Sequence, residues 1–455
     1  MKKKIIFSTC IILFILFYSI IFGMLLKLHF LGNDKFHKLS SFANYLAQIP
    51  FKYNPKKIIL DIKRYSNPEI DLEASNNKVS GKKQFNVFKK KKRDDLLMLS
   101  RYDGDLKRSI VQIISLNDYR IIHEYKPDIN YINQEIIKKD KKKIYKNILR
   151  DSSIVRNRIY HPVINNEGDM FFSEGVGSPL IRVDFCGNLK SINLDKFHHS
   201  LNFDDDGNLW AVSLMTPYSK FVQKNLPKYI KDVFHDDAIT KLDKDGKLIW
   251  KRSFFEILVK NNLLKNYDQR LTSSYDPIHV NDVQPVSSDG AFWKKGDVLV
   301  STSKQHTIYL YRPSEDRIIK SISGHFDSQH DVDIYDSTSI IFYNNNRGGY
   351  LSGYNQILKY DFANEKISTL IDNTMKEMNI YTPREGLTDV LSDGSFMVEE
   401  SNGGRLFIID KNGNLEFQFN NVTSENKGYI LNWSRVIKDK KMINSIKEKI
   451  NKNTC

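Results

Sequence analysis

The sequence predicts an all-β fold, a six-bladed β-propeller with helical insertions, and three observations support this prediction. Short apolar segments flanked by turn residues recur six times from Asp94 onward, in the same order. Repeats of about 40 to 50 residues with about four strands each are typical of propeller blades. A composition of 40% hydrophobic and 27% charged residues provides a packed core and excludes a disordered chain. We therefore expect one ring in place of the roughly three domains that 455 residues suggest at ~150 residues each.

An apolar segment at the N-terminus predicts a transmembrane helix ahead of the ring. Lys2, Lys3 and Lys4 precede Ile5–Leu26, a 22-residue run without a charged side chain. At ~1.5 Å per residue, a helix of this length spans the ~30 Å hydrocarbon layer. A cleaved signal peptide would have a shorter apolar region and a small-x-small site, and neither is evident. We expect residues 1–27 to be a single-pass anchor in the inner membrane, with the bulk of the chain on the periplasmic, exported side.

Basic residues cluster between the predicted folded segments. Residues 28–93 are expected to form short helices and a polar linker, which ends in the basic run Lys89–Arg93. Similar runs at Lys138–Lys143 and Lys438–Lys441 contribute to a formal net charge of +15. None is interleaved with aromatic residues, and no helix-turn-helix or zinc-finger spacing occurs, so we expect no nucleic-acid partner. We interpret these basic runs as solvated loops or helix faces. The alternative interpretation is that they contact an anionic membrane surface near the anchor.

The six repeats span residues 94–435. Their leading strand segments are Asp95–Ser100, Gly168–Ser173, Gly207–Ser213, Gly296–Ser301, Ser339–Tyr343 and Gly394–Glu399. Turn pairs such as Asp245-Gly246 and Asn412-Gly413 favour antiparallel hairpins after them. A further strand is expected just upstream of each leading segment, where it would line the central channel.

Wide spacing between repeats marks insertions, and we expect helical structure in three of them: Ile129–Arg150, Tyr218–Phe234 and Phe254–Tyr267. The segment Ile430–Arg435 is expected to close the ring, before a C-terminal helix within residues 436–455. Three cysteines, Cys10, Cys186 and Cys455, are too few for a disulfide framework and match no metal-binding spacing. A single Cys186–Cys455 bridge is left open.

A polar residue stands at the start of the inner strand in five repeats: His161, His199, His279, His330 and Glu385. Equivalent positions in different blades converge on the channel mouth. Any one histidine is explained by a hydrogen bond between blades, but the set predicts an axial pocket suited to nucleophilic, acid–base or anion-binding chemistry. No carboxylate or cysteine lies at ligand spacing beside the histidines, so we expect neither a metal nor another cofactor.

Several phrases appear in order along the chain: His198-His199 followed by Asp206–Trp210, then Asp276–Pro285, Gly296–Ser301, Tyr311–Ser314, Ser328–Asp333 and Glu399–Arg405. Together, over roughly residues 155–435, they resemble the arylsulfotransferase family. The resemblance implies a six-bladed propeller that transfers a sulfuryl group from a phenolic sulfate ester to a phenol, without the nucleotide donor 3'-phosphoadenylyl sulfate. The sequence has no glycine-rich phosphate loop, in agreement with a nucleotide-free donor.

The resemblance also implies roles for the channel histidines. His330, in a Gln-His context, matches the residue that attacks sulfur and becomes a sulfohistidine, and His199 and His279 match residues that bind and polarise the sulfonate. Where the family usually carries an arginine in a Ser-x-Arg setting, this chain has Ser301-Thr-Ser303 followed by Lys304. The candidates for compensating this loss are Lys304, His306 and Arg347, and the remaining substrate-binding candidates are Asn281, Glu385 and His161.

The expected partners are therefore a small anionic aromatic sulfate ester, a phenolic acceptor and, through the N-terminal helix, a membrane. A homodimer is left open. The alternative function is a catalytically silent propeller that binds an anionic ligand or a protein partner, and a metal-dependent hydrolase or lactonase is a third option.

Overall fold

The computed structural model describes residues 2–30, 39, 42, 43, 46, 67, 69–75, 78–175, 177–225, 234–264, 276–347, 353–452 and 455. The chain divides into two compact units. One comprises Met1–Ile70, Val222–Phe234 and Asn266–Tyr275, and the other Asp71–Phe221, His235–Lys265 and Asp276–Cys455. Most of the predicted linker and parts of the second and third insertions lie outside the described residues.

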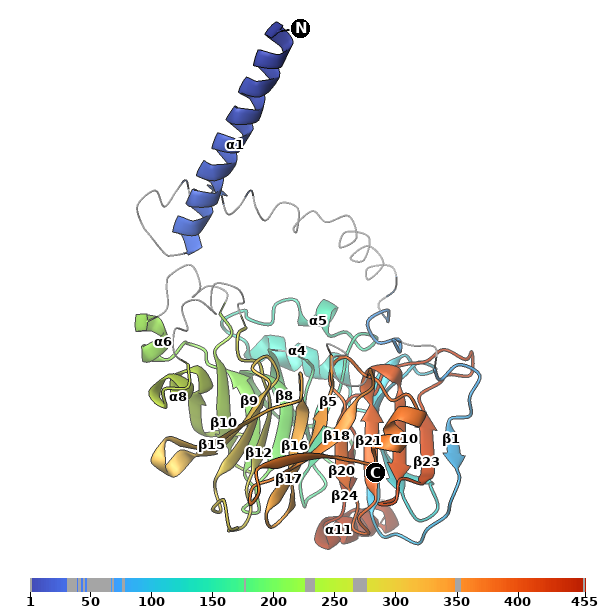
Figure 1. The fold of residues 1–455 in the computed structure, drawn as a ribbon. Helices are drawn as coiled ribbons and strands as arrows, with labels where there is room; N and C mark the ends of the chain where they lie inside the picture. Colours follow the sequence, from blue (N-terminus) through green and yellow to red (C-terminus); the bar gives the residue numbers. More distant parts are fainter. Residues whose placement is uncertain are drawn as a thin grey trace. The chain divides into compact units, whose positions relative to one another are not determined.

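The first unit contains helix α1, Lys2–Phe30 (Figure 1, blue). It covers the segment for which the sequence predicts a transmembrane anchor. Among the residues that the structure describes, however, no helix combines the length and the apolar character needed to cross a bilayer. The predicted anchor is therefore not confirmed.

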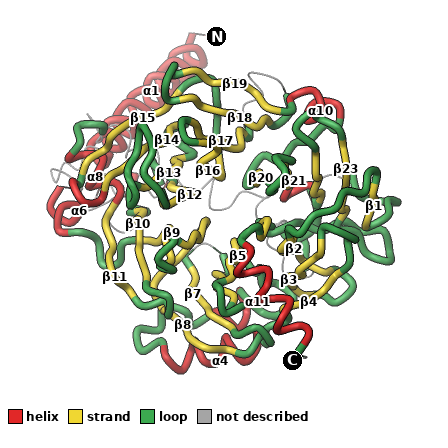
Figure 2. The backbone as a smooth tube through the Cα atoms, turned by 90° about the horizontal axis from the view of Figure 1, so that it is seen from below, coloured by secondary structure: helices red, strands yellow, loops and turns green. Residues whose placement is uncertain are grey.

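The second unit is a propeller-like arrangement of five antiparallel sheets around a common axis (Figure 2). In sheet order, the strands of the three four-stranded sheets are β24 (Arg435–Ile437), β2 (Leu96–Asp103), β3 (Arg108–Ser115) and β4 (Ile121–Tyr125); β12 (Val280–Pro285), β13 (Val298–Thr302), β14 (Thr307–Arg312) and β15 (Arg317–Ser323); and β16 (His330–Asp336), β17 (Ser339–Asn344), β18 (Gln356–Asp361) and β19 (Lys366–Leu370). The five-stranded sheet contains β20 (Leu387–Val390), β21 (Phe396–Glu400), β22 (Arg405–Ile409), β23 (Leu415–Asn420) and β1 (Phe85–Val87).

The remaining sheet has seven strands and corrects the prediction of six separate blades. Its strands are β5 (Tyr160–Ile164), β6 (Met170–Ser173), β7 (Ser178–Val183), β8 (Leu189–Phe203), β9 (Leu209–Leu214), β10 (Asp237–Leu242) and β11 (Leu248–Ser253). The strand β8 has 15 residues; Leu189–Phe197 pairs with β7, and Phe197–Phe203 with β9. No glycine or proline interrupts this segment, so the second and third repeats share one continuous strand.

Apolar side chains fill the spaces between neighbouring sheets, which explains the continuous apolar strand segments of the sequence. All eight residues of β2 are buried, because both of its faces are covered. Leu96 and Met98 join one core cluster with Phe172 and Ile181, whereas Leu97 and Leu99 join another that contains Phe417. A strand buried on both faces loses the polar–apolar alternation of a half-exposed strand.

Strands from the two ends of the propeller unit close the ring. The C-terminal β24 pairs with β2 through Leu97↔Val436 and its neighbours, and the N-terminal β1 pairs with β23 through Phe85↔Phe419. The closing strand was expected at Ile430–Arg435, but β24 begins at Arg435, and the expected segment contributes the isolated bridge Arg101↔Leu431 before it. The ring therefore closes a few residues later than the sequence predicts.

The insertions form short helices on the outside of the sheets (Figure 1). The predicted helix Ile129–Arg150 is split into α4 (Ile129–Lys139) and α5 (Ile148–Asp151), and the Asp128 side chain caps α4. The other described helices are α6 (Lys220–Asn225), α8 (Phe254–Lys260), α10 (Asp372–Glu377) and α11 (Lys440–Asn451). Pro313–Glu315 and Ser401–Gly403 form single 3₁₀ turns.

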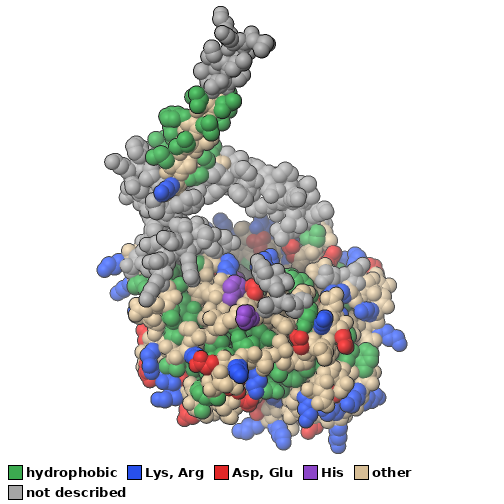
Figure 3. Space-filling model, viewed as in Figure 1, with side chains coloured by type: hydrophobic (Ala, Val, Ile, Leu, Met, Phe, Trp, Pro, Cys, Tyr) green, Lys and Arg blue, Asp and Glu red, His purple; other side chains and the backbone are tan. Residues whose placement is uncertain are grey.

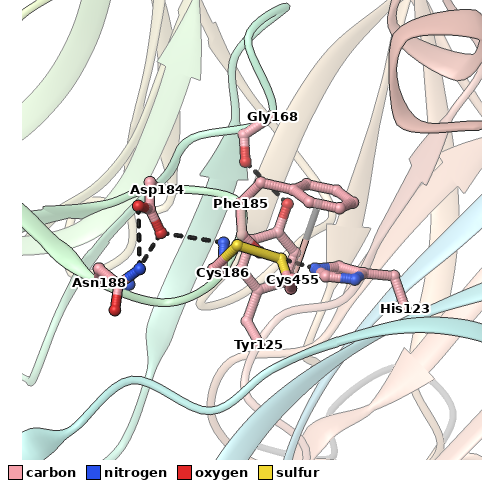
Figure 4. The surroundings of a disulfide bond; sticks show 8 residues. All are labelled: His123, Tyr125, Gly168, Asp184, Phe185, Cys186, Asn188 and Cys455. Carbon is pink, nitrogen blue, oxygen red and sulfur yellow. Dashed lines mark hydrogen bonds between the residues drawn. A yellow bond between two sulfur atoms is a disulfide. The ribbon is translucent and has the colours of Figure 1, made fainter. Parts of the chain in front are cut away.

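A disulfide joins Cys186 to Cys455, the pairing that the sequence left open (Figure 4). Cys186 lies in the turn between β7 and β8, where the Asp184 carboxylate accepts hydrogen bonds from the backbone N–H groups of Cys186 and Asn188. Cys455 follows α11, whose Ile443 and Ile446 are buried in the first core cluster. The bridge thus fastens the end of the chain to the second strand repeat.

Candidate functional site

Four of the predicted residues, His161, His199, His279 and His330, come together although they belong to different inner strands or to the residues just before them. The ring centroid of His199 lies 6.0 Å from that of His161, 4.8 Å from that of His279 and 6.5 Å from that of His330. The indole of Trp433 completes the cluster, with its ring 3.7 Å from His161 and 6.3 Å from His330. Histidine side chains are visible on one face of the molecule (Figure 3).

A recurring backbone feature turns these side chains toward one another. His161, His199, His279 and Glu385 have φ angles of 48°, 57°, 56° and 58°, in the left-handed region that non-glycine residues rarely adopt. In the strand of His330 the residue with positive φ is its neighbour Asp331, at 53°. Such conformations cost about 1 to 3 kcal/mol each and concentrate at functional sites. The positive φ angle therefore recurs at or next to the same position, the start of the inner strand, in successive repeats.

His330 is held as a neutral imidazole with a defined tautomer. Its Nδ1 lies 2.7 Å from Asn345 Oδ1 and 3.0 Å from the carbonyl oxygen of Ser328. The Asn345 amide is fixed in turn, because its Nδ2 donates to the carbonyl oxygens of Thr382 and Glu385. Both neighbours of Nδ1 are acceptors, so Nδ1 carries the proton and Nε2 keeps its lone pair. Burial lowers the pKa of His330 to about 4, so the ring is uncharged at neutral pH.

His279 has the opposite electrostatic environment. Its Nδ1 lies 2.5 Å from Asp276 Oδ2, and its side chain is 29% exposed. Burial acts to lower the pKa of His279, but the hydrogen bond and the negative charge of Asp276 outweigh it and raise that pKa. Asp276 therefore stabilises the imidazolium form of His279, whereas burial disfavours that form at His161, His199 and His330.

His199 and His161 are buried deeper in the cluster. The Nδ1 atoms of His198 and His199 lie 2.7 Å apart, so one ring donates and the other accepts a hydrogen bond. Among the described residues, neither ring nitrogen of His161 has a hydrogen-bond partner, although the side chain is fully buried. Burial lowers the pKa of both His161 and His199 well below the usual value, so both are neutral.

The other predicted substrate-binding residues are placed unevenly. Lys304 Nζ lies 3.5 Å from Asp276 Oδ2. His306 accepts a hydrogen bond from the backbone N–H of Ser328 at its Nδ1, which is also 3.1 Å from Asp327 Oδ1. Lys304 and His306 therefore lie at the margin of the cluster. Arg347 is exposed and makes no hydrogen bond or ion pair within the described part of the chain.

Asn281 and Glu385 are buried, and the Asn281 Nδ2 and the Glu385 carboxylate are engaged with the protein, whereas Asn281 Oδ1 has no hydrogen-bond partner among the described residues. Asn281 Nδ2 donates to the carbonyl oxygen of Gln329, next to His330. The Glu385 carboxylate accepts from the hydroxyl of Tyr160 and forms an ion pair with Arg158 at 3.2 Å. Both residues hold the walls of the site in this structure.

Sequence reasoning missed several residues of these walls. Asn345 lies in the run Asn344–Asn346, which carried no recognised pattern, and its role depends on a contact with the next inner strand. Trp433 lies in the expected closing segment, and its backbone N–H donates to Glu399 Oε1, which fixes it beside His161. Asp276 was noticed as part of a phrase, but its spacing of three residues before His279 was not used. That spacing is the one signal from which a sequence reader could have paired the two.

The possible metal ligands and the cavity near the inner strands were compared with the histidine cluster. Within the described ranges, no group of three or more His, Cys, Asp or Glu side chains is arranged to hold a metal ion. A cavity of about 350 Å³ lies among the inner strands, but its walls include Asp331, Asp333, Asp389 and Arg435 and none of the clustered histidines. The site is thus defined by the convergent histidines.

Comparison with known protein families identifies the family of this chain. A sequence model described as arylsulfotransferase (ASST) matches residues 168–422, which is more than half of the chain. The chain belongs to the arylsulfotransferase family. It is accordingly a sulfotransferase-like enzyme at the family level. The matched range of this arylsulfotransferase includes His199, His279 and His330, whereas His161 and Trp433 lie outside it.

Solved structures resemble this arylsulfotransferase only distantly. A protein of unknown function from Bacteroides caccae is 12% identical, with a TM-score of 0.47 over 76% of this chain and 100% of that one. The WD40 β-propeller domain of Doa1 is 14% identical, with a TM-score of 0.39 over 82% and 98%. A streptogramin B lyase is 9% identical, with a TM-score of 0.39 over 78% and 97%. Such similarities carry no information on function. Among curated proteins, no relative matches the sequence.

Proposed function

We propose that this arylsulfotransferase moves a sulfuryl group from a phenolic sulfate ester to a phenol through a sulfohistidine at His330. The observation that supports the proposal best is the state of His330. Its Nδ1–H is held by two acceptors and its ring is neutral, so the lone pair on Nε2 is available for attack. No 3'-phosphoadenylyl sulfate takes part.

In this proposal the other histidines bind the sulfonate. A sulfonate oxygen only accepts hydrogen bonds, so in this proposal His199 presents Nε2–H to it. The positive charge of His279 stabilises the negative oxygens during transfer. Lys304 lies 3.5 Å from the Asp276 carboxylate that holds His279, and we propose that it compensates for the family's arginine, which Ser303 replaces.

The test is to incubate the purified protein with 4-nitrophenyl sulfate and to look for a sulfuryl adduct of about 80 Da on the peptide that contains His330. We expect the adduct in the absence of an acceptor, its loss on addition of a phenol, and none in His330→Gln. His325→Gln, at an exposed histidine, is the matched control and should retain the adduct. If a sulfate ester raises the melting temperature but no adduct or transfer is found, the protein is the silent anion binder instead.

We also propose that α1 anchors the enzyme in a membrane, with the propeller unit on the exported side. Two observations support this placement: large apolar side chains from Ile11 to Met24 are exposed on α1, and the Cys186–Cys455 disulfide is of a kind that persists in oxidising compartments. The full chain should stay in the membrane fraction during an alkaline carbonate wash, and a variant without residues 2–27 should not. Release of the full chain by the wash would contradict the anchor.

A further inference from the structure

We propose that His279 and Asp276 form the acid–base dyad of the transfer reaction: His279 gives a proton to the leaving phenolate oxygen and later takes one from the acceptor phenol. This assignment rests on the proposed function and adds to it a catalytic role that sulfonate binding alone does not provide.

The geometry of the pair carries the assignment. The Asp276 carboxylate lies three residues before His279 and meets its Nδ1 at 2.5 Å, which fixes the imidazole plane and leaves Nε2 as the nitrogen available to a substrate. His279 Nε2 has no hydrogen-bond partner in the described ranges. The ring stands almost perpendicular to that of His199, at an interplanar angle of 87° and a centroid distance of 4.8 Å. The two rings therefore approach the same space beside His330.

Exposure separates His279 from the other histidines of the cluster. Its side chain is 29% exposed, whereas His161, His199 and His330 are no more than 6% exposed as residues. The aryl part of a sulfate ester enters from solvent, so the ester oxygen that leaves with it lies on the open side of the sulfur. A proton donor for that oxygen must lie on the same side, and His279 does.

The charges around the pair suit a proton donor. Burial acts to lower the pKa of His279, but Asp276, and to a smaller extent Asp237, raise it, while Lys304 acts in the opposite sense. The pKa of His330 is instead lowered to about 4 by burial. Environments that push the pKa values of neighbouring groups apart assign the acid to one group and the nucleophile to the other.

The two displacements then balance. In the first, the Nε2 lone pair of His330 forms a bond to sulfur, the bond from sulfur to the aryl oxygen breaks, and that oxygen takes the proton from His279 Nε2. His330 keeps its Nδ1 proton, so the sulfo-imidazole is a zwitterion and no further base is required. In the second, the acceptor oxygen attacks sulfur, its proton passes to His279 Nε2, and the electron pair of the N–S bond returns to His330.

The test compares two donors that differ in their need for an acid. 4-Nitrophenolate leaves readily without protonation, whereas the phenol released from phenyl sulfate has a pKa of about 10, like that of tyrosine. General acid catalysis contributes about 10²- to 10⁴-fold. We expect His279→Gln to slow sulfation of His330 by about that factor with phenyl sulfate, and by no more than about tenfold with 4-nitrophenyl sulfate. Asp276→Asn, which keeps the imidazole, should show a smaller difference of the same sign.

His199→Gln is the matched variant within the cluster, because it removes a sulfonate contact without removing the acid. It should slow both donors by the same factor. Equal losses with both donors in His279→Gln, in a variant whose thermal unfolding shows it to be folded, would overturn the dyad and leave His279 as an anion-binding residue. Failure of the wild-type protein to form any adduct with 4-nitrophenyl sulfate would instead overturn the proposed function, and with it the dyad.

Discussion

A side-chain amide, together with the carbonyl oxygen of Ser328, sets the tautomer of the proposed nucleophile. Asn345 Oδ1 accepts from His330 Nδ1, and the orientation of the amide is fixed by two backbone carbonyls from the segment that precedes β20. The orientation of this amide is thus fixed from the next strand repeat. Without Asn345, the carbonyl oxygen of Ser328 would be the remaining acceptor for Nδ1–H among the described residues, and the tautomer with the proton on Nε2, which lacks the lone pair there, would become more populated.

Replacement of Asn345 tests this role at the residue scale. Asn345→Leu should slow sulfation of His330 by about 10-fold, because one hydrogen bond is worth about 1 kcal/mol and the Ser328 carbonyl oxygen then holds the tautomer without the help of the amide. Asn345→Asp keeps the shape but places a negative charge beside the ring, which raises the pKa of His330 and favours the imidazolium. The measurement is the pseudo-first-order rate of adduct formation as a function of pH.

The two variants differ in their expected pH dependence. On the acidic side, the wild-type rate should fall as the pH drops toward about 4, the pKa of His330, because the ring is neutral above it. In Asn345→Asp the fall should begin at a higher pH. An unchanged pH profile in Asn345→Asp, together with an unchanged rate in Asn345→Leu, would show that Asn345 does not control His330.

At the residue scale the sequence located the histidines correctly but not their roles. The recurring position before each inner strand was visible as spacing, and the structure brings His161, His199, His279 and His330 together. The engagement of Asn281 and Glu385 with backbone and neighbouring side chains was not visible. Whether a polar residue faces ligand or protein depends on partners from other strands, and no local pattern encodes those partners.

At the scale of elements, the C-terminal helix depends on a covalent contact that bridges 269 residues of sequence. The helix α11 has only Ile443 and Ile446 buried, while its other side chains carry much of the local positive charge. A helix of this length gains most of its stability from packing. The Cys186–Cys455 bridge restricts the unfolded chain and retains the helix on the sheet edge.

Removal of this bridge should have a measurable cost. Cys186→Ser is expected to lower the free energy of unfolding by about 2 to 4 kcal/mol, since a cross-link closing a long loop reduces the entropy of the unfolded chain. The measurement is denaturant unfolding without reductant, with Cys10→Ser as the control that leaves the bridge intact. Equal unfolding midpoints for Cys186→Ser and the wild type would exclude a stabilising role.

The two halves of strand β8 were predicted from the sequence, but their union in one strand was not. Each of its halves was expected as part of a different repeat, and each does pair with the neighbour expected for that repeat. The continuity between the halves was not expected, because strand periodicity describes each half equally well alone. The helices of the first and third insertions were placed correctly in the chain but were expected to be longer than they are, since tertiary packing decides how many residues of an amphipathic segment remain helical.

At the scale of the whole molecule, strands from opposite ends of the propeller unit lock the ring. Val436 pairs with Leu97, and Phe85 with Phe419, so neither terminal sheet is complete without a segment remote in sequence. The closing segment also carries Trp433 against His161 and His330. Closure of the fold and completion of the site are therefore the same structural event.

The sequence by itself determined the strand repeat, the antiparallel hairpins, the family and the set of channel histidines. Each of these is recorded in local order: apolar runs, turn residues, and one polar residue at a fixed place in the repeat. The tertiary structure alone decided that one strand serves two repeats, that Cys186 pairs with Cys455, and that burial lowers the pKa of His330 whereas Asp276 raises that of His279. The physical reason is that continuity, pairing and pKa depend on which side chains and backbone groups meet after the ring has closed.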